Sequence, residues 1–147
     1  TIDMVTDFIE SGDKVVIACC FDEELYTLQE HFKDECVIYN GKMNLKEKDE
    51  AVRKFMTEPE TKVFIGNINA AGVGITLTSA TKLIFNNISF VPSDNQQMCD
   101  RIHRLNQSKP VDIYYQLFRG TQYEKMWNIV LKKELVINQV IKKEDEK

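Results

Sequence analysis

Five short runs rich in β-branched and aromatic residues alternate along the chain with segments whose apolar residues recur at helical spacing. Helical connections of about ten residues or more favour parallel strands, because a parallel pair needs a crossover of that length. The run KVVIACC at 14–20 is continuously apolar after its lysine, which is typical of a strand covered on both faces. The pattern predicts a doubly wound α/β domain, with a mostly parallel sheet and helices on both faces.

Strands are predicted at 14–20, 37–39, 62–65, 82–86 and 112–117. A short leading helix is predicted at 1–11 and a long C-terminal helix at about 121–143. Three other helices are expected to begin at side chains that can cap a helix N-terminus. These are Asp22, Asn44 in a capping box with Glu47 before a helix to about Met56, and Ser93 in a capping box with Gln96 before a helix to about Leu105.

Loops that follow parallel strands meet at one edge of the sheet, where doubly wound domains carry their functional groups. We therefore expect four loops to share this edge. They are 20–22, 40–42, 66–74 and 87–92.

Composition limits what such a domain can do. The length of 147 residues allows one domain, and no run of about 18 apolar residues could span a membrane. A net charge of -4 argues against binding nucleic acid through bulk charge, so any such contact must be local. The four cysteines form no C-x-x-C pair, which disfavours zinc binding and a disulfide scaffold and favours a reducing, intracellular compartment.

The stretch QQMCDRIHRLNQ at 96–107 carries the strongest chemical signal. On a helix it would have a cationic face and, beside it, an apolar face that can enter the core. The first face holds Gln97, Arg101 and Arg104, and the second holds Met98, Ile102 and Leu105. Two guanidinium groups one turn apart suit bidentate binding of a phosphate chain. The alternative is a solvated face whose arginines pair with nearby carboxylates.

The small-residue segment NAAGVGITLTSA at 69–80 is the second candidate. Gly72 and Gly74 allow a ligand to approach the backbone closely, and the hydroxyl groups of Thr76 and Thr78 can donate to phosphates. Helix–sheet packing requires small residues equally often, so this segment alone is not specific.

Several catalytic patterns are missing from the chain. It contains no G-x-x-x-x-G-K-[ST] loop, no H-E-x-x-H metal spacing and no G-x-S-x-G nucleophile elbow. The chain therefore cannot assemble the nucleotide cradle of a P-loop NTPase by itself.

In order, the segments 14–21, 40–55, 69–80 and 97–107 resemble helicase motifs IV, IVa, V and VI of the SWI/SNF-type ATPases, a branch of the superfamily-2 helicase-like proteins. The resemblance covers about 14–118. Its most specific part is Gln97–Gln107 with Phe90-Val91-Pro92 ahead of it, which is similar to the family's W-N-P-x-x-x-x-Q-A-x-D-R-x-H-R-x-G-Q. The Ala70-Ala71-x-x-Gly74-Ile75-Thr76 pattern looks closest to the annealing-helicase branch.

The sequence departs from the family's pattern at five positions. They are Phe90 for Trp, Val91 for Asn, Met98 for Ala, Asn106 for Gly, and Asn69 where many members have Arg.

In that family two RecA-like lobes clamp ATP between them. The resemblance implies that residues 1–147 form one second lobe of RecA-like fold, which supplies motif V and VI residues to the ATP site of a DNA translocase. It also implies roles for individual residues. Arg104 would be the arginine finger with Arg101 beside it; Gln97, Gly72 and Gly74 would bind nucleotide; and Asn40, Gly41, Lys42, Thr76 and Thr78 would contact the DNA backbone.

The same resemblance implies ATP and Mg²⁺ as cofactors, held mainly by an N-terminal RecA-like lobe of the same protein. It implies double-stranded or forked DNA as a partner, and an intracellular location in the nucleus or a bacterial or phage-infected cytoplasm. We expect the lobe alone to be a monomer without ATPase activity, since it lacks a P-loop. A non-catalytic nucleotide-binding or interaction scaffold is the alternative, and the sequence leaves the physiological substrate and direction of movement open.

Overall fold

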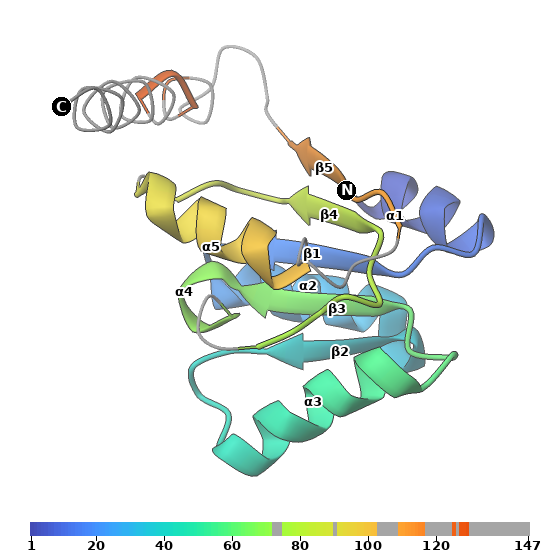
Figure 1. Ribbon diagram of the computed structural model, residues 1–147. Coiled ribbons are helices and arrows are strands. Elements are labelled where there is room, and N and C mark those ends of the chain that lie inside the picture. The colour runs from blue at the N-terminus through green and yellow to red at the C-terminus, as the bar shows by residue number, and fades with distance from the viewer. Residues whose placement is uncertain (72–74, 90, 103–108, 117–124, 126, 130–147) are drawn as a thin grey trace, which may run out of the picture.

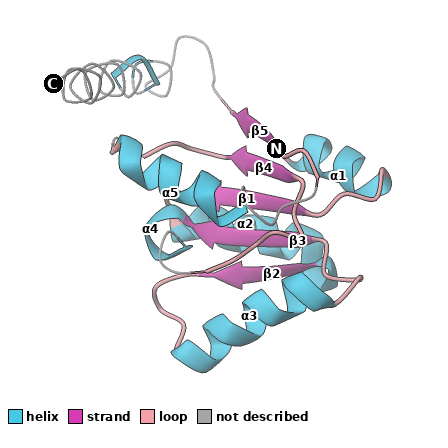
Figure 2. Cartoon of the chain, viewed as in Figure 1, coloured by secondary structure: helices cyan, strands magenta, loops and turns pink. Residues whose placement is uncertain are grey.

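Five parallel strands form the sheet that the alternating sequence pattern predicts, as Figures 1 and 2 show. In the computed structural model of the chain, the described residues are 1–71, 75–89, 91–102, 109–116, 125 and 127–129. The strands are β1 (Val15–Cys19), β2 (Cys36–Tyr39), β3 (Val63–Asn67), β4 (Lys82–Phe85) and β5 (Asp112–Tyr115). All of the predicted strands are therefore confirmed, with ends that differ by at most two residues.

The strand order β2-β3-β1-β4-β5 places the first strand at the centre of the sheet. Val15 is in register with Val63 of β3 on one side and with Lys82 of β4 on the other. All arrowheads in Figure 1 point the same way, so the loops after the strands meet at one edge, which we call the carboxyl rim. The order reverses at β1, and such a switch point is where doubly wound sheets bind ligands.

Helices cover both faces of this sheet. They are α1 (Ile2–Glu10), α2 (Asp22–Phe32), α3 (Leu45–Thr57), α4 (Ile68–Ala71) and α5 (Pro92–Ile102), with a short 3-10 helix at Lys33–Glu35. α1 and α2 pack on one face through Val5, Leu25 and Phe32. α3 and α5 pack on the other through Phe55, Met98 and Ile102, in the core cluster that also contains Ile68 of α4.

The central strand is buried on both faces. Val16 and Ala18 belong to the core under α3 and α5, and Val15 and Ile17 belong to the core under α1 and α2. All five residues of β1 have zero exposure, which explains why its sequence is a continuous apolar run and does not alternate.

The predicted helix starts agree with the structure at α3 and differ at α2 and α5. Asn44 caps α3 by accepting a hydrogen bond from the Glu47 amide at 2.8 Å, as predicted. The prediction that Asp22 is an N-cap is wrong, because Phe21 takes that position and Asp22 is the first helical residue. The prediction that Ser93 caps α5 is also wrong. This helix begins at Pro92, whose fixed φ and missing N–H suit the first helical position.

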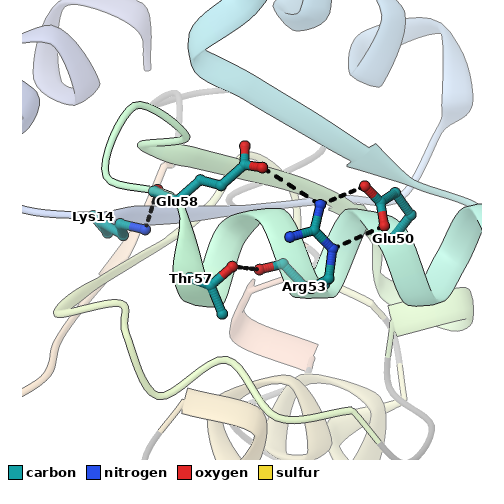
Figure 3. Close-up of polar contacts among 5 residues, drawn as sticks. All are labelled: Lys14, Glu50, Arg53, Thr57 and Glu58. Carbon is teal, nitrogen blue, oxygen red and sulfur yellow. Dashed lines mark hydrogen bonds and ion pairs between the residues drawn. The ribbon is translucent and has the colours of Figure 1, made fainter.

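Lys14 joins the start of β1 to the C-terminal end of α3 (Figure 3). Its Nζ donates to the backbone oxygens of Phe55 at 2.5 Å and of Glu58 at 2.8 Å. Carbonyl groups at a helix C-terminus lack partners within the helix and carry the negative end of its dipole, so an ammonium group stabilises them. Partial burial lowers the pKa of Lys14, although Glu58 and Glu60 act in the opposite direction.

Arg53 makes ion pairs on the outer surface of the same helix. Figure 3 shows its guanidinium between the carboxylates of Glu50, at 2.6 Å, and Glu58, at 3.4 Å. All three side chains are more than one-third exposed, so these pairs contribute little stability. The backbone contacts of Lys14 are therefore the more important polar link at this end of α3.

We expect Lys14→Met to lower the free energy of unfolding by about 1–3 kcal/mol, because two carbonyl groups lose a charged donor. The exposed Lys46 at the other end of α3 provides the control, and Lys46→Met should change stability by less than about 0.5 kcal/mol. Urea unfolding monitored by circular dichroism measures both. Equal midpoints for Lys14→Met and the wild type would contradict the capping role.

Candidate functional site

Asn87 ties the end of β4 to the end of β1 at the switch point. Its Oδ1 accepts a hydrogen bond from the Cys20 amide at 2.8 Å, and its Nδ2 donates to Glu24 Oε1 at 2.7 Å. Asn87 is only 3% exposed, and the second carboxylate oxygen of Glu24 is buried without a hydrogen-bond partner among the described residues. This amide therefore fixes the loop after β1 and the first turn of α2 relative to β4.

Asn67, at the end of β3, likewise connects neighbouring segments of the rim through its side-chain amide. Its Nδ2 donates to Asp22 Oδ1 at 3.2 Å and to the Cys20 backbone oxygen at 3.4 Å. Its Oδ1 accepts from the Asn69 amide at 3.0 Å, which positions the start of α4. Sequence reasoning missed both Asn67 and Asn87. The available signal was an asparagine within two residues of the end of an apolar strand, but its partners depend on which strands are neighbours.

The loop at 40–42 is held from beneath by Asn40. This side chain is 1% exposed; its Oδ1 accepts from the Lys42 amide at 3.2 Å, and its Nδ2 donates to the Tyr26 hydroxyl at 3.1 Å. Gly41 and Lys42 are exposed above it. A Cβ added at Gly41 would meet no atom within 4 Å, so the surroundings of this glycine leave its backbone accessible. Of the three predicted DNA contacts in this loop, the structure therefore places two at the surface and one below it.

α5 carries the predicted cationic face. Met98 and Ile102 are fully buried, which confirms the predicted apolar face at these two positions. Gln97 is exposed and Arg101 is half-buried, whereas Arg104 and Leu105 lie outside the described residues. α5 begins beside the carboxyl rim and runs back across the sheet, as Figure 1 shows. At a rise of 1.5 Å per residue Arg101 lies about 14 Å along the axis from Pro92, over the sheet rather than at the rim.

A backbone hydrogen bond connects the segment after α4 to α5. The Leu77 amide donates to the Arg101 carbonyl oxygen at 2.8 Å, and Leu77 itself is fully buried. Thr76 and Thr78 on either side are half-buried. The chain then reaches the edge opposite the carboxyl rim, where the Thr81 amide donates to the Lys14 carbonyl oxygen at 3.1 Å. The structure thus brings the two predicted motif segments together, but it separates Thr78 from the loop at 40–42.

The predicted glycines Gly72 and Gly74 lie outside the described residues, so the structure does not place them. In the described part of the chain, no group of three or more His, Cys, Asp or Glu side chains could hold a metal ion. These residues therefore do not fit a Mg²⁺ site, and we assign no chemical step to Mg²⁺ on them. Among the described helices, none combines the length and the apolar character needed to cross a bilayer.

The cysteines are free thiols, and three of them are poor nucleophiles. Burial, with Glu24 nearby, raises the pKa of Cys19 to about 12 and that of Cys20 to about 11. Burial also raises the pKa of Cys36 to about 11, with Asp34 and Glu35 contributing. Thiolate chemistry near neutral pH is therefore unfavourable at these positions.

The five-stranded parallel sheet, its order and its two helical layers define a RecA-like α/β lobe. A solved structure supports this assignment: the C-terminal part of the Fun30 ATPase domain is similar with a TM-score of 0.78 and 25% identity, over 88% of this chain and 44% of that one. Residues 1–106 match the family described as helicase conserved C-terminal domain. The chain belongs to this family.

Two curated relatives support the resemblance to SWI/SNF-type ATPases. The chromatin-remodeling ATPase INO80 of Sclerotinia sclerotiorum is 31% identical over 136 residues, covering 90% of this chain and 8% of that protein. The DNA annealing helicase and endonuclease ZRANB3 of Bos taurus is 33% identical over 115 residues, covering 78% of this chain and 11% of that protein. The chain thus spans about a tenth of the length of these relatives.

We expect Asn87→Ala to lower the free energy of unfolding by about 2–3 kcal/mol, because the Cys20 amide loses its acceptor and the Glu24 carboxylate loses its donor. Asn69→Ala is the control, since Asn69 is exposed on α4 and its replacement should cost less than about 0.5 kcal/mol. Chemical denaturation measures both variants. Equal losses for the two would show that the Asn87 contacts do not stabilise the rim.

We expect Cys19, Cys20 and Cys36 in the folded chain to react slowly with iodoacetamide at pH 8. Raised pKa values lower the thiolate fraction at pH 8 by about 200- to 2,000-fold relative to a thiol of pKa near 8.5. The rate should rise about tenfold per pH unit up to pH 10, because deprotonation occurs only near pH 11–12. Mass spectrometry of peptides from folded and urea-unfolded chain gives the comparison. Equal labelling of both forms at pH 8 would contradict the effect of burial.

Proposed function

We propose that this chain acts as the second lobe of a DNA-dependent ATPase and translocase of the SWI/SNF type. The observation that carries the proposal is the anchoring of α5, the motif VI helix. Met98 and Ile102 hold it in the core, so that the exposed Gln97 and the half-buried Arg101 have fixed positions. The Leu77–Arg101 backbone hydrogen bond joins this helix to the motif V segment. Side chains fixed in this way suit a preorganised phosphate-binding surface.

In the proposed site the arginines act on the phosphates of ATP clamped between two lobes. Arg104 approaches the transferring γ-phosphoryl group and neutralises the charge that develops there, and Arg101 supports the same charge. Gln97, Gly72 and Gly74 contact the nucleotide. Mg²⁺, when bound mainly by the first lobe, would neutralise phosphate charge. The relatives are named as ATPases and a helicase, which supports nucleotide use by this family.

The DNA contacts in the proposal are local because the chain carries a net charge of -4. The exposed Gly41 backbone and the Lys42 ammonium meet phosphate oxygens, as do the hydroxyl groups of Thr76 and Thr78. Asn40 acts from beneath by fixing the Lys42 amide, since its own side chain is buried. Contacts of this kind do not read base sequence, and double-stranded or forked DNA would satisfy them.

The proposed partners are DNA and an N-terminal RecA-like lobe of the same protein, in the cell compartment that contains DNA. Closure of the two lobes around ATP would couple hydrolysis to movement along DNA. The lobe alone would be a monomer without ATPase activity, because its sequence lacks a P-loop.

We expect Arg104→Ala, in the longer protein that contains both lobes, to reduce DNA-stimulated ATP turnover by about 10³-fold or more, as for other arginine fingers. Arg101→Ala should lose part of the activity. Nucleotide affinity should change little, because the first lobe makes most ground-state contacts. The melting temperature of Arg104→Ala should also change little, because alanine is a better helix former than arginine on the helix that the sequence predicts to about Leu105. Steady-state ATPase assays, nucleotide titration and thermal unfolding measure the three quantities.

Lys109→Ala is the matched control and should be close to neutral in turnover. If Arg104→Ala kept more than about a third of wild-type turnover, the loss of transition-state stabilisation would be below roughly 1 kcal/mol and the finger assignment would be wrong. A wild-type protein without any DNA-stimulated ATPase activity would favour the interaction-scaffold alternative.

A further inference from the structure

We propose that Asp22 is an intramolecular counter-ion of Lys42 and that it lowers the affinity of the carboxyl rim for DNA. This inference rests on the proposed function, because it assumes that Lys42 meets a DNA phosphate. It adds a residue at the start of α2 that opposes DNA binding, beside the loop at 40–42, whose proposed contacts favour binding.

Asp22 lies where three rim loops meet. One carboxylate oxygen, Oδ2, lies 3.9 Å from the Lys42 Nζ in the loop after β2. The other, Oδ1, accepts the hydrogen bond from Asn67 Nδ2 at 3.2 Å, at the last residue of β3. Asp22 itself belongs to the loop after β1 and opens α2. One carboxylate therefore has a cationic partner on one side and an amide donor on the other.

The two ends of the ion pair differ in their freedom to move. The Lys42 side chain is 76% exposed, whereas that of Asp22 is 27% exposed. Asp22 is fixed by Asn67, which is itself fixed by its bonds to Cys20 and Asn69. A phosphate that attracts the lysine can therefore draw it away, but the carboxylate stays behind. Binding then exchanges one ionic partner of Lys42 for another and leaves an anion close to the DNA.

The neighbouring carboxylates on α2 do not share this position. Glu24 Oε1 accepts a hydrogen bond from Asn87 Nδ2 at 2.7 Å, away from Lys42. Glu23 is exposed and lines a separate cavity with Thr27, Asn86 and Gln116. Asp22 is thus the carboxylate of this turn that faces the loop at 40–42, and Glu23 offers a control with the same charge.

The experiment measures binding of the 147-residue chain to fluorescein-labelled duplex DNA by fluorescence anisotropy, over a series of KCl concentrations. Asp22→Asn removes the charge and keeps an oxygen that can accept from Asn67. We expect it to tighten binding by about two- to fivefold at low salt, the range for exposed ion pairs. The salt dependence should steepen, because no freed carboxylate takes up a cation when DNA binds. Melting temperatures verify that each variant is folded, and Asp22→Ser serves if the amide variant is unstable.

The controls separate this inference from the proposed function. Glu23→Gln makes the same change in net charge as Asp22→Asn. It should give less than half of the increase in DNA affinity that Asp22→Asn gives. Lys42→Ala should weaken binding, and in its background Asp22→Asn should give no more than Glu23→Gln does. An equal gain from Glu23→Gln, a gain that persists without Lys42, or no gain at all would overturn the role of Asp22. If Lys42→Ala left DNA affinity unchanged, the DNA role of this loop would fail, and the inference with it.

Discussion

Complete burial of β1 is the constraint on which the rest of the structure depends. A strand with no exposed residue must have paired neighbours on both edges and helices on both faces, and β3, β4 and the two helical layers supply them. Since all of these strands are parallel, their following loops meet around the end of β1. The location of the candidate site is thus a consequence of how the core is built.

The carboxyl rim is polar, and its polar groups must be satisfied where they are buried. Asn40, Asn67 and Asn87 each provide a donor and an acceptor on one short side chain, so each can bond a neighbouring loop in both directions. A buried amide that lost one of these partners would cost more than the bond itself contributes. The asparagines therefore hold the rim loops in one arrangement and leave the exposed Gly41 and Lys42 available to a ligand.

Local sequence was sufficient where a short-range pattern decides the structure. The strands, the Asn44 cap and the buried face of α5 were predictable because strand runs, capping boxes and helical periodicity act within a few residues. The hydrogen bonds of Asp22 and Asn40 could not be predicted from local sequence. Their partners Asn67 and Tyr26 come from other elements, and the strand order decides which elements are neighbours. The prediction of where α5 begins was wrong for a local reason, because Pro92 is favoured at the first helical position and the helix therefore begins before Ser93.

The bonding of α5 also limits how the proposed ATPase could transmit force. Met98 and Ile102 fix the helix in the core, and the Arg101 carbonyl oxygen fixes the segment around Leu77 to the same helix. The residues of α5 that are proposed to face the nucleotide and the proposed motif V segment around Leu77 are therefore parts of one packed unit, and packed cores resist continuous deformation. Movement within the lobe would break buried contacts, whereas movement between two lobes would break only their interface. In the proposed ATPase, rigid-body closure would thus be the less costly way to connect ATP hydrolysis at one surface to DNA bound at another.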